Sequence, residues 1–481
     1  MTTIKLDPGA ALLLDALHGA GHAAYAVGGC VRDSLLGLDP HDWDLCTSAR
    51  PEQVMALFGE EKCIPTGLQH GTVTVKQGGR LYETTTFRTE GAYSDGRHPD
   101  AVCFVPDVRE DLARRDFTIN AMAYSAEEGL IDPFDGRDDL AAHLVRAVGE
   151  PERRFEEDAL RILRLYRFAA RFGFAIDPAT GAAARALGPH LDCVSAERIQ
   201  EELLKLLAAP RPGIYLEPAV LAVVLPELET EKQPERFAEL CRIIDRIEPT
   251  AENVPARLAA LLCPLGEAGA RKALRKLKCS NALTDEVTTL VGGSVGSFLL
   301  GHEFELRHPA DALCLERHSH PAGRCPNSNS LFPPQAAVVA VAGHSIARPI
   351  ACGNRVPPQR TVLGETPGTP NTTLTVQAKR LLGRYELPTI QRLTALCSAR
   401  HPEQAEAFSA LQAEAERLTA ENACCRVSQL AVNGRDLMAA GVRPGPGLRQ
   451  VLNALLEAVI TGQTPNEKDA LLAAAARFSA S

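Results

Sequence analysis

The chain has 481 residues, which is too long for one ordinary hydrophobic core and predicts roughly three domains. Its formal net charge of −9 argues against indiscriminate nucleic-acid binding over the whole surface but allows a local basic groove. No apolar run reaches the roughly 18 residues that span a bilayer, and MTTIKLDPGA has no signal-peptide core, so we expect a cytoplasmic protein without membrane association.

The first elements lead to two closely spaced carboxylates. Residues 4–22 carry Leu12, Leu13, Leu14 and Leu17 at helical spacing, which predicts a core-facing helix. The stretch 25–47 then reads as a strand, a paired-glycine turn, a short helix and a second strand. On that strand we expect Asp42 and Asp44 to point to one face and Trp43 and Leu45 to the other.

The pattern Asp-x-Asp favours a metal-assisted phosphoryl or nucleotidyl transfer site. Adjacent carboxylates repel unless a cation lies between them, and Mg²⁺ commonly bridges carboxylates and substrate phosphates. Gly28 and Gly29 allow backbone N–H groups to approach a phosphate, and Arg32 with Asp33 follows one turn later. Each motif alone also occurs by chance in surface turns.

A β-rich region follows. Residues 51–58 predict a helix that begins at Pro51. Segments 66–75 and 81–91 predict a hairpin with a turn at Gly78 and Gly79, and 91–100 predicts a mobile loop. Glu83 is either a third carboxylate near the Asp-x-Asp pair or a solvated strand residue.

Polar residues gather in the segment 111–124. We expect a helix to begin there, with Arg114, Arg115, Asp116 and Asn120 clustered at its start. This cluster suits recognition of a triphosphate or sugar, or else is a charged helix cap. Residues 130–140 then predict a strand end and a turn.

A single helix is predicted over 151–172, with one arc formed by Asp158, Arg161, Arg164, Arg167 and Arg171. Acceptors on Asp158 and donors on Arg161 suit the Watson–Crick edge of a base, and the other arginines suit stacking or phosphate contacts. The alternative is an intrahelical Asp-to-Arg ion pair on a solvated face.

The remainder is predominantly helical. Segment 195–207 predicts a helix capped by Ser195, and helical patterning continues to residue 300 with a break at 216–228. Residues 301–376 are irregular, which favours disorder or foreign origin over a zinc site formed by Cys314, His318, His320 and Cys325. Helices return at 377, and the tail has one apolar face that comprises Leu448, Leu452, Leu455 and Val459. The 14 cysteines predict reduced, mostly buried thiols.

Read together, these stretches resemble the class II tRNA nucleotidyltransferase and bacterial poly(A) polymerase family, and most closely its CCA-adding enzymes. The matching motifs stand in family order: VGGCVRD, HDWDLCT, TGLQHGTVTV, TTFRTEGAYSDGRHPD, RRDFTINAMAY, DPFDGRDDL, EEDALRILRLYRFAARFGF and SAERIQEELLKLL. The C-terminal segment from LAVNGRDL onward is also similar to the tail of these enzymes.

The resemblance implies an α+β fold with a polymerase-beta-like head followed by an all-helical neck, body and tail. We expect a catalytic head at 1–145, a base- and RNA-recognising neck at 146–230, a body at 231–300, the irregular segment at 301–376, and a tRNA-binding tail at 377–481.

It also implies roles for individual residues. Asp42 and Asp44 would bind the catalytic Mg²⁺ ions, and Gly29 and Arg32 would contact the nucleotide. Arg115 and Asn120 would hold its phosphates and sugar. Asp158 and Arg161 would select the base, with Arg164 and Arg167 completing the pocket.

The implied reaction is attack of the tRNA 3′-hydroxyl on the α-phosphate of CTP or ATP, with release of pyrophosphate and no nucleic-acid template. The alternatives are a poly(A) polymerase, an enzyme limited to CC or A addition, a small-molecule nucleotidyltransferase, and a non-catalytic RNA-binding protein. Some relatives carry a His-Asp metal pair after RLAALL, where this chain has Cys263 and Pro264, so we expect no phosphohydrolase activity.

Overall fold

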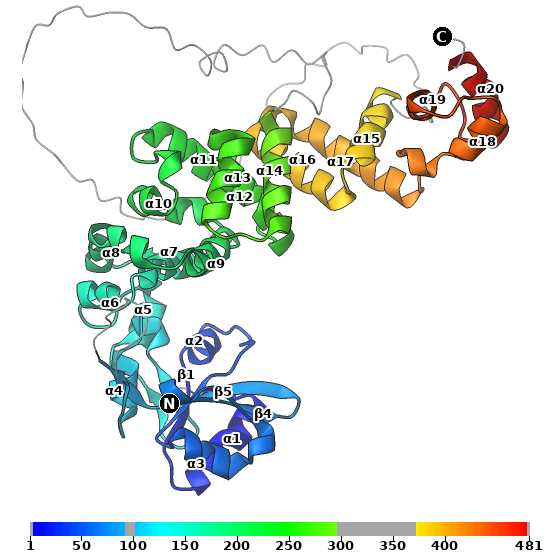
Figure 1. Cartoon of the computed structure of the whole chain (residues 1–481). Helices are drawn as coiled ribbons and strands as arrows, with labels where there is room; N and C mark the ends of the chain where they lie inside the picture. Colours follow the sequence, from blue (N-terminus) through cyan, green and yellow to red (C-terminus); the bar gives the residue numbers. More distant parts are fainter. Residues whose placement is uncertain (1–2, 92–101, 296–371, 479–481) are drawn as a thin grey trace, which may run out of the picture.

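The computed structural model describes residues 3–91, 102–295 and 372–478. Strands in the described residues end at Ile176, and helices make up the regular structure of the described chain after it (Figure 1). The expected α+β class, with a mixed sheet at the N-terminal end followed by helices, is confirmed.

A seven-stranded sheet forms the N-terminal part, in the order β3-β4-β5-β2-β1-β8-β9. Its strands are β1 (Ala24–Val27), β2 (Leu45–Thr47), β3 (Cys63–Gly67), β4 (Thr72–Gln77), β5 (Arg80–Thr86), β8 (Ala123–Ser125) and β9 (Gly129–Ile131). The β2–β5 pair is parallel, with Leu45 opposite Thr84, and the other pairs are antiparallel. The parallel pair places the segment before β2 next to the middle of β5.

The hairpin of β4 and β5 is confirmed, with Gly78 and Gly79 at φ +58° and +81°. Both angles lie in the left-handed region that a two-residue turn of this kind requires, where glycine carries no Cβ penalty. Segment 66–75, however, is not one strand. A short 3₁₀ turn at Leu68–His70 separates the end of β3 from β4.

Helices cover the sheet: α1 (Pro8–Gly19), α2 (Gly29–Leu35), α3 (Pro51–Phe58), α4 (Val108–Ala113) and α5 (Gly136–Ala141). The Asp7 carboxylate caps α1 by accepting hydrogen bonds from the backbone N–H groups of Gly9 and Ala10. Leu13, Leu14 and Leu17 are buried as expected. Leu12 was expected on the same core face, but it is 56% exposed.

The helix expected over 151–172 is broken into α6 (Pro151–Glu157) and α7 (Leu160–Phe172). At the break, Asp158 adopts extended backbone angles, and its carboxylate accepts a hydrogen bond from the N–H of Leu160 at 3.1 Å. A short acidic side chain that bonds nearby backbone in this way competes with helix continuation.

Further helices follow: α8 (Pro178–Ala186), α9 (Ala196–Leu207), α10 (Pro218–Val224), α11 (Pro234–Arg246), α12 (Val254–Leu262), α13 (Gly266–Lys276) and α14 (Asn281–Val295). Ser195 precedes α9 as expected, but its side chain makes no capping hydrogen bond. The expected break at 216–228 contains the short helix α10.

The C-terminal helices are α15 (Thr372–Arg384), α16 (Leu387–Arg400), α17 (Ala405–Ala420), α18 (Gly434–Ala439), α19 (Pro446–Ile460) and α20 (Lys468–Phe478). Because α15 begins at Thr372, the expectation of irregular structure is wrong for 372–376. The remainder of 301–376, with Cys314, His318, His320 and Cys325, lies outside the described residues, as does most of the loop predicted at 91–100.

One hydrophobic core runs from Ile4 in the N-terminal part to Cys425 after α17, and α18–α20 enclose a separate core. The tail face is confirmed, with Leu455 and Val459 buried and Leu448 and Leu452 packed against them. The described cysteines are free, but the expectation that most are buried is wrong: Cys30, Cys46, Cys63, Cys397 and Cys425 are buried, and the other described cysteines are partly or fully exposed. None of the helices in the described ranges has the length and apolarity of a membrane span.

Candidate active site

The Asp42 and Asp44 carboxylates lie at the centre of the sheet, but in the segment immediately before β2 rather than on a strand as expected. The backbone nevertheless alternates as it would on a strand, because the Asp44 carbonyl accepts a hydrogen bond from the Val27 N–H at 2.9 Å. Asp42 and Asp44 are exposed, whereas Trp43 and Leu45 are buried, so the expected two-sided arrangement is confirmed.

Electrostatic repulsion acts on this carboxylate pair. Desolvation of its carboxyl group, with the nearby charges of Glu83 and Asp42, raises the pKa of Asp44 to about 6, and Arg115 opposes this effect. Glu83 on β5 therefore lies close enough to influence Asp44. Hard carboxylate oxygens under mutual repulsion are the donor set that Mg²⁺ prefers, so these residues fit the expected cation.

Glu83 does not form a three-carboxylate metal site with Asp42 and Asp44 in this structure. Within residues 3–91, 102–295 and 372–478, no group of three or more His, Cys, Asp and Glu side chains is arranged to hold a metal ion. Glu83 thus acts on Asp44 through its charge.

Gly28 lies close to the Arg115 guanidinium. Gly28 ends β1 with φ +76° and ψ −121°, and a Cβ added to it would lie 2.9 Å from Nη1 of Arg115. The Arg115 guanidinium is anchored by Asp111, with Nη2 3.2 Å from Oδ2. Its Nε is buried and has no hydrogen-bond partner in the described part of the chain, which leaves a donor for an anionic ligand.

The polar residues of 114–120 do not begin a helix, which corrects the expectation. The helix α4 ends at Ala113, and a 3₁₀ turn at Thr118–Asn120 follows Asp116. Asn120 is buried and engaged at both amide atoms: Oδ1 accepts from Arg32 Nη1 at 2.5 Å, and Nδ2 donates to Asp116 at 3.0 Å. It connects Arg32 with Asp116.

Arg32 is only 3% exposed. Its Nε donates to Asp33 at 2.7 Å, and its guanidinium lies over the rings of Phe168 and Phe172, at 5.3 and 4.8 Å from their centroids. Gly29 lies beside it, since an added Cβ would be 3.6 Å from Arg32 Nη2. In this structure the Arg32 charge is satisfied internally and connects α2 to α7.

The arginine arc of α7 faces carboxylates from several elements, whereas a solvated face or a base-binding face was expected. Each of its arginines has an acidic partner, in the pairs Arg161–Glu157 at 2.8 Å, Arg164–Asp116 at 2.6 Å, Arg167–Glu202 at 2.6 Å and Arg171–Asp33 at 3.1 Å. Glu157 and Glu202 were not singled out in the sequence; the i,i+4 spacing of Glu157 and Arg161 was an available signal, whereas Glu202 comes from another helix.

The bond between Arg164 and Asp116 joins α7 to the segment that carries Arg115. Arg164 donates to one Asp116 oxygen through both Nε and Nη2, at 2.9 and 2.6 Å. Burial opposes ionisation of Asp116, but Arg164 and the Asn120 hydrogen bond hold its pKa well below the usual range. Arg161 adds a hydrogen bond to the Arg114 carbonyl at 3.0 Å. Residues 114 and 116, on either side of Arg115, are thereby fixed to α7.

Asp158 and Arg161 are neighbours but do not pair with one another. The Asp158 carboxylate receives two hydrogen bonds from Arg198 of α9, at 2.7 and 3.2 Å, and Arg161 bonds Glu157 and backbone carbonyls. The intrahelical Asp-to-Arg pair considered from the sequence is therefore wrong. Arg198 was missed, although it stands in the quoted segment SAERIQEELLKLL.

Comparison with known proteins matches three segments to family models. Residues 24–146 match the poly A polymerase head domain, 173–231 match the probable RNA and SrmB-binding site of polymerase A, and 384–475 match the putative tRNA nucleotidyltransferase domain 2.

Similar proteins include the CCA-adding enzyme of Lactiplantibacillus plantarum, which is 32% identical over 462 residues that cover 96% of this chain and 93% of that protein. The CCA-adding enzyme of Lactobacillus helveticus is 42% identical over 285 residues, or 58% of this chain and 69% of that protein. Among solved structures, the Bacillus stearothermophilus CCA-adding enzyme in complex with CTP aligns with a TM-score of 0.69 and 29% identity over 98% of both chains.

Proposed function

Because the chain belongs to the CCA-adding enzyme family, we propose that it extends the 3′ end of tRNA with C, C and A, taken from CTP and ATP, without a nucleic-acid template. The observation that carries this proposal is the connection of the Asp42 and Asp44 pair, through Arg115 and its neighbours, to α7 and the Asp158 carboxylate. This connection supports a phosphate-binding site that is held next to a base-binding site.

The proposed reaction is attack of the terminal tRNA 3′-hydroxyl oxygen on the α-phosphate, with cleavage of the bond to pyrophosphate. Asp42 and Asp44 would hold Mg²⁺, which when bound assists removal of the hydroxyl proton and neutralises charge on the leaving group. Arg115, with its free Nε, would bind the triphosphate, and the Gly28–Gly29 turn lets the backbone approach it.

Base selection is assigned to Asp158 and Arg161, with Arg164 and Arg167 supporting them. Arg198 holds the Asp158 carboxylate and Glu157 holds Arg161, and these bonds would orient the two side chains for a base. Arg32 and Asn120 are proposed to position α2 and residue 116 beside the nucleotide, because their polar atoms already bond within the protein.

The functional division follows the expected boundaries. We assign catalysis to 1–145, base and RNA recognition to 146–230, a supporting body to 231–300, and tRNA binding to 377–481. The match of 384–475 to a tRNA nucleotidyltransferase domain supports the last assignment.

The direct test is incubation with tRNA that lacks its 3′ end and with each labelled nucleotide, followed by sequencing of the product. We expect ordered addition of two C residues and one A. Long A tails would identify a poly(A) polymerase, and addition of only CC or only A would identify a partial enzyme. Failure to bind tRNA would favour a small-molecule acceptor.

Replacing Gly28 with alanine is expected to lower kcat/KM for CTP by roughly 10- to 100-fold, because a strained φ and a close Arg115 contact shift a phosphate-binding group. Steady-state incorporation into tRNA measures this. Gly21→Ala is the matched control, since Gly21 also has a positive φ of +84° but has no atom within 4 Å of an added Cβ. Equal activity losses in the two variants would contradict the specific role of Gly28.

Replacing Arg198 with alanine is expected to reduce kcat/KM for CTP and ATP by about tenfold and to weaken discrimination against UTP, because two charge-assisted hydrogen bonds no longer orient Asp158. Ratios of kcat/KM for the three nucleotides measure the effect. Lys205→Ala on the same helix, which removes an exposed pair with Glu201, is the control. An unchanged CTP-to-UTP ratio in Arg198→Ala would contradict the prediction.

A further inference from the structure

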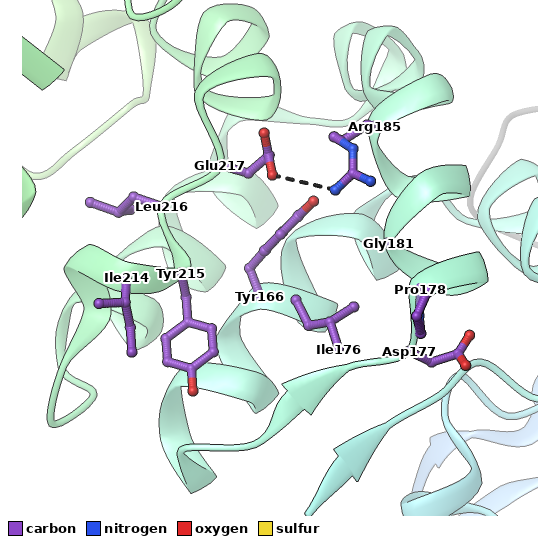
Figure 2. A pocket seen from close by; sticks show the side chains of 10 residues that line it. All are labelled: Tyr166, Ile176, Asp177, Pro178, Gly181, Arg185, Ile214, Tyr215, Leu216 and Glu217. Carbon is purple, nitrogen blue, oxygen red and sulfur yellow. Dashed lines mark ion pairs between the residues drawn. The ribbon is translucent and has the colours of Figure 1, made fainter. Parts of the chain in front are cut away.

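A pocket of about 190 Å³ lies on the face of α7 opposite the arginine arc. Tyr166 of α7 lines the pocket, together with β11 (Ala175–Ile176), α8 and the segment 214–217. Figure 2 shows Tyr166 reaching toward the ion pair of Arg185 and Glu217. The proposed catalytic residues do not line this pocket.

The Tyr166 hydroxyl is a hydrogen-bond donor in the pocket lining that has no partner among the described residues. Its side chain is 4% exposed, and its Oη has no hydrogen-bond partner in the described residues. Burial, with the nearby Glu217 carboxylate, raises the pKa of Tyr166, so the hydroxyl keeps its proton at neutral pH. Buried hydroxyl groups are normally hydrogen-bonded, so this one points to a ligand.

Two charged groups stand beside this hydroxyl. Arg185 and Glu217 are 3.7 Å apart, with Arg185 half exposed, so the pair is loose enough to admit another polar group between its members. The pocket edge therefore offers donors from Tyr166 and Arg185 and an acceptor from Glu217. Its complement is a group with an amino N–H next to a lone-pair acceptor.

The walls favour a flat ring. Tyr215 and Ile214 stand on one side of Tyr166, and Ile176 and Pro178 stand on the other (Figure 2). Ile214 is 60% exposed. The volume is below the roughly 300–1,000 Å³ of pockets for drug-sized ligands, so a single ring system suits it. Gly181 keeps the wall open, since an added Cβ would approach Ile176 to 3.3 Å.

Two further arginines interact with residues that line the pocket. Arg211 lies near Tyr215 and is exposed, and the Arg146 side chain is 47% exposed beside Asp177. An aromatic side chain flanked by arginines is the combination that binds single-stranded nucleic acid, by stacking on the base and pairing with phosphates.

We propose that this pocket binds one unpaired base whose Watson–Crick edge has an amino group next to a ring-nitrogen acceptor, which is cytosine or adenine, with the amino group donating to Glu217 and the ring nitrogen accepting from Tyr166 or Arg185. Uracil lacks the amino group and is excluded. The base belongs either to a free nucleotide or to RNA, and the RNA source rests on the proposed function. The match of 173–231 to a probable RNA-binding site agrees with that source.

The test compares wild type with Tyr166→Phe and Glu217→Gln by fluorescence anisotropy, using labelled hexamers of C, A and U, and competition by CMP, AMP and UMP. Tyr166→Phe removes only an unpaired hydroxyl and preserves the ring, and Tyr385→Phe is its control. We expect affinity for C and A hexamers to fall about five- to tenfold in both variants, with weak U binding unchanged.

The hexamer and mononucleotide measurements distinguish the two sources of the base. If the variants also lose competition by CMP and AMP, the pocket binds a free nucleotide. If the variants lose affinity only for the C and A hexamers, the pocket binds RNA. Either result supports the pocket. Affinities equal to wild type in both variants overturn it, as they would if a protein segment occupied the pocket. A parallel assay of CCA addition by the wild type tests the proposed function separately. If the wild type adds CCA but both variants bind the hexamers as tightly as the wild type, only the pocket proposal is disproved.

Discussion

Replacing Asp44 with asparagine is expected to lower nucleotide incorporation into tRNA roughly 1,000-fold or more, because the change removes a charged oxygen ligand from the proposed Mg²⁺ site. The amide has nearly the same shape as the carboxylate, and the backbone bond from Val27 to the Asp44 carbonyl remains. The fold should therefore survive. Single-turnover incorporation of labelled CTP, with the variant's circular dichroism alongside, measures both effects.

Asp42→Asn is expected to behave like Asp44→Asn, and the double variant should lose little more, because residues that hold one catalytic centre are not additive. Glu52→Gln on α3, an exposed carboxylate, is the control and should retain full activity. Chelation of divalent cations should reduce the wild type to the level of the variants. Incorporation by Asp44→Asn at near wild-type rate would show that this pair is not the catalytic centre.

Replacing Arg257 with leucine is expected to destabilise the helical body by about 3–5 kcal/mol, because several buried carbonyl groups lose their only charged donor at once. Arg257 is completely buried. Its guanidinium donates to the carbonyls of Leu207, Ala209, Pro210 and Ile247, at distances from 2.5 to 3.4 Å. One side chain thus ties the end of α9 to α11 and α12.

Calorimetry should show the shift, as a fall of roughly 10 °C in the transition that contains α9 and α12. Hydrogen exchange should become faster at residues 207–211 and 247. Arg242→Leu on α11, which removes an exposed pair with Glu239, is the matched control and should change stability by about 0.5 kcal/mol or less. A Tm for Arg257→Leu equal to that of the control would contradict the role assigned to this network.

Much of the fold follows from local sequence patterns. The Gly78–Gly79 hairpin, the helix from Pro51 and the apolar tail face depend on residues close in the chain, and each is present. The break at Asp158 could not be predicted from helical periodicity, because periodicity does not show whether the Asp158 carboxylate bonds the backbone N–H of Leu160. Helical periodicity also failed to predict that Leu12 is exposed, because the period of a helix does not show how wide its buried face is.

In the candidate site, the proximity of Asp42, Asp44 and Glu83 could be anticipated from alternation and strand pairing. The partners of the arginines on α7 could not, because Glu202 and Asp116 come from other elements. Residue type alone suggested that Arg32 is a nucleotide contact, but only the packing of α2 against α7 reveals that its guanidinium lies over the rings of Phe168 and Phe172. The hydrogen-bond network of Arg257 could not be predicted from the sequence, which shows only that this arginine lies in an apolar segment.

The pairing of every arginine on the α7 arc with a carboxylate has a consequence for how tRNA affinity responds to salt. A phosphate that reaches one of these arginines displaces a protein carboxylate and not a condensed counterion. Such contacts add little to the slope of log affinity against log salt, which counts released ions. Salt titration would thus report the exposed basic side chains elsewhere on the protein and understate the phosphates held at α7.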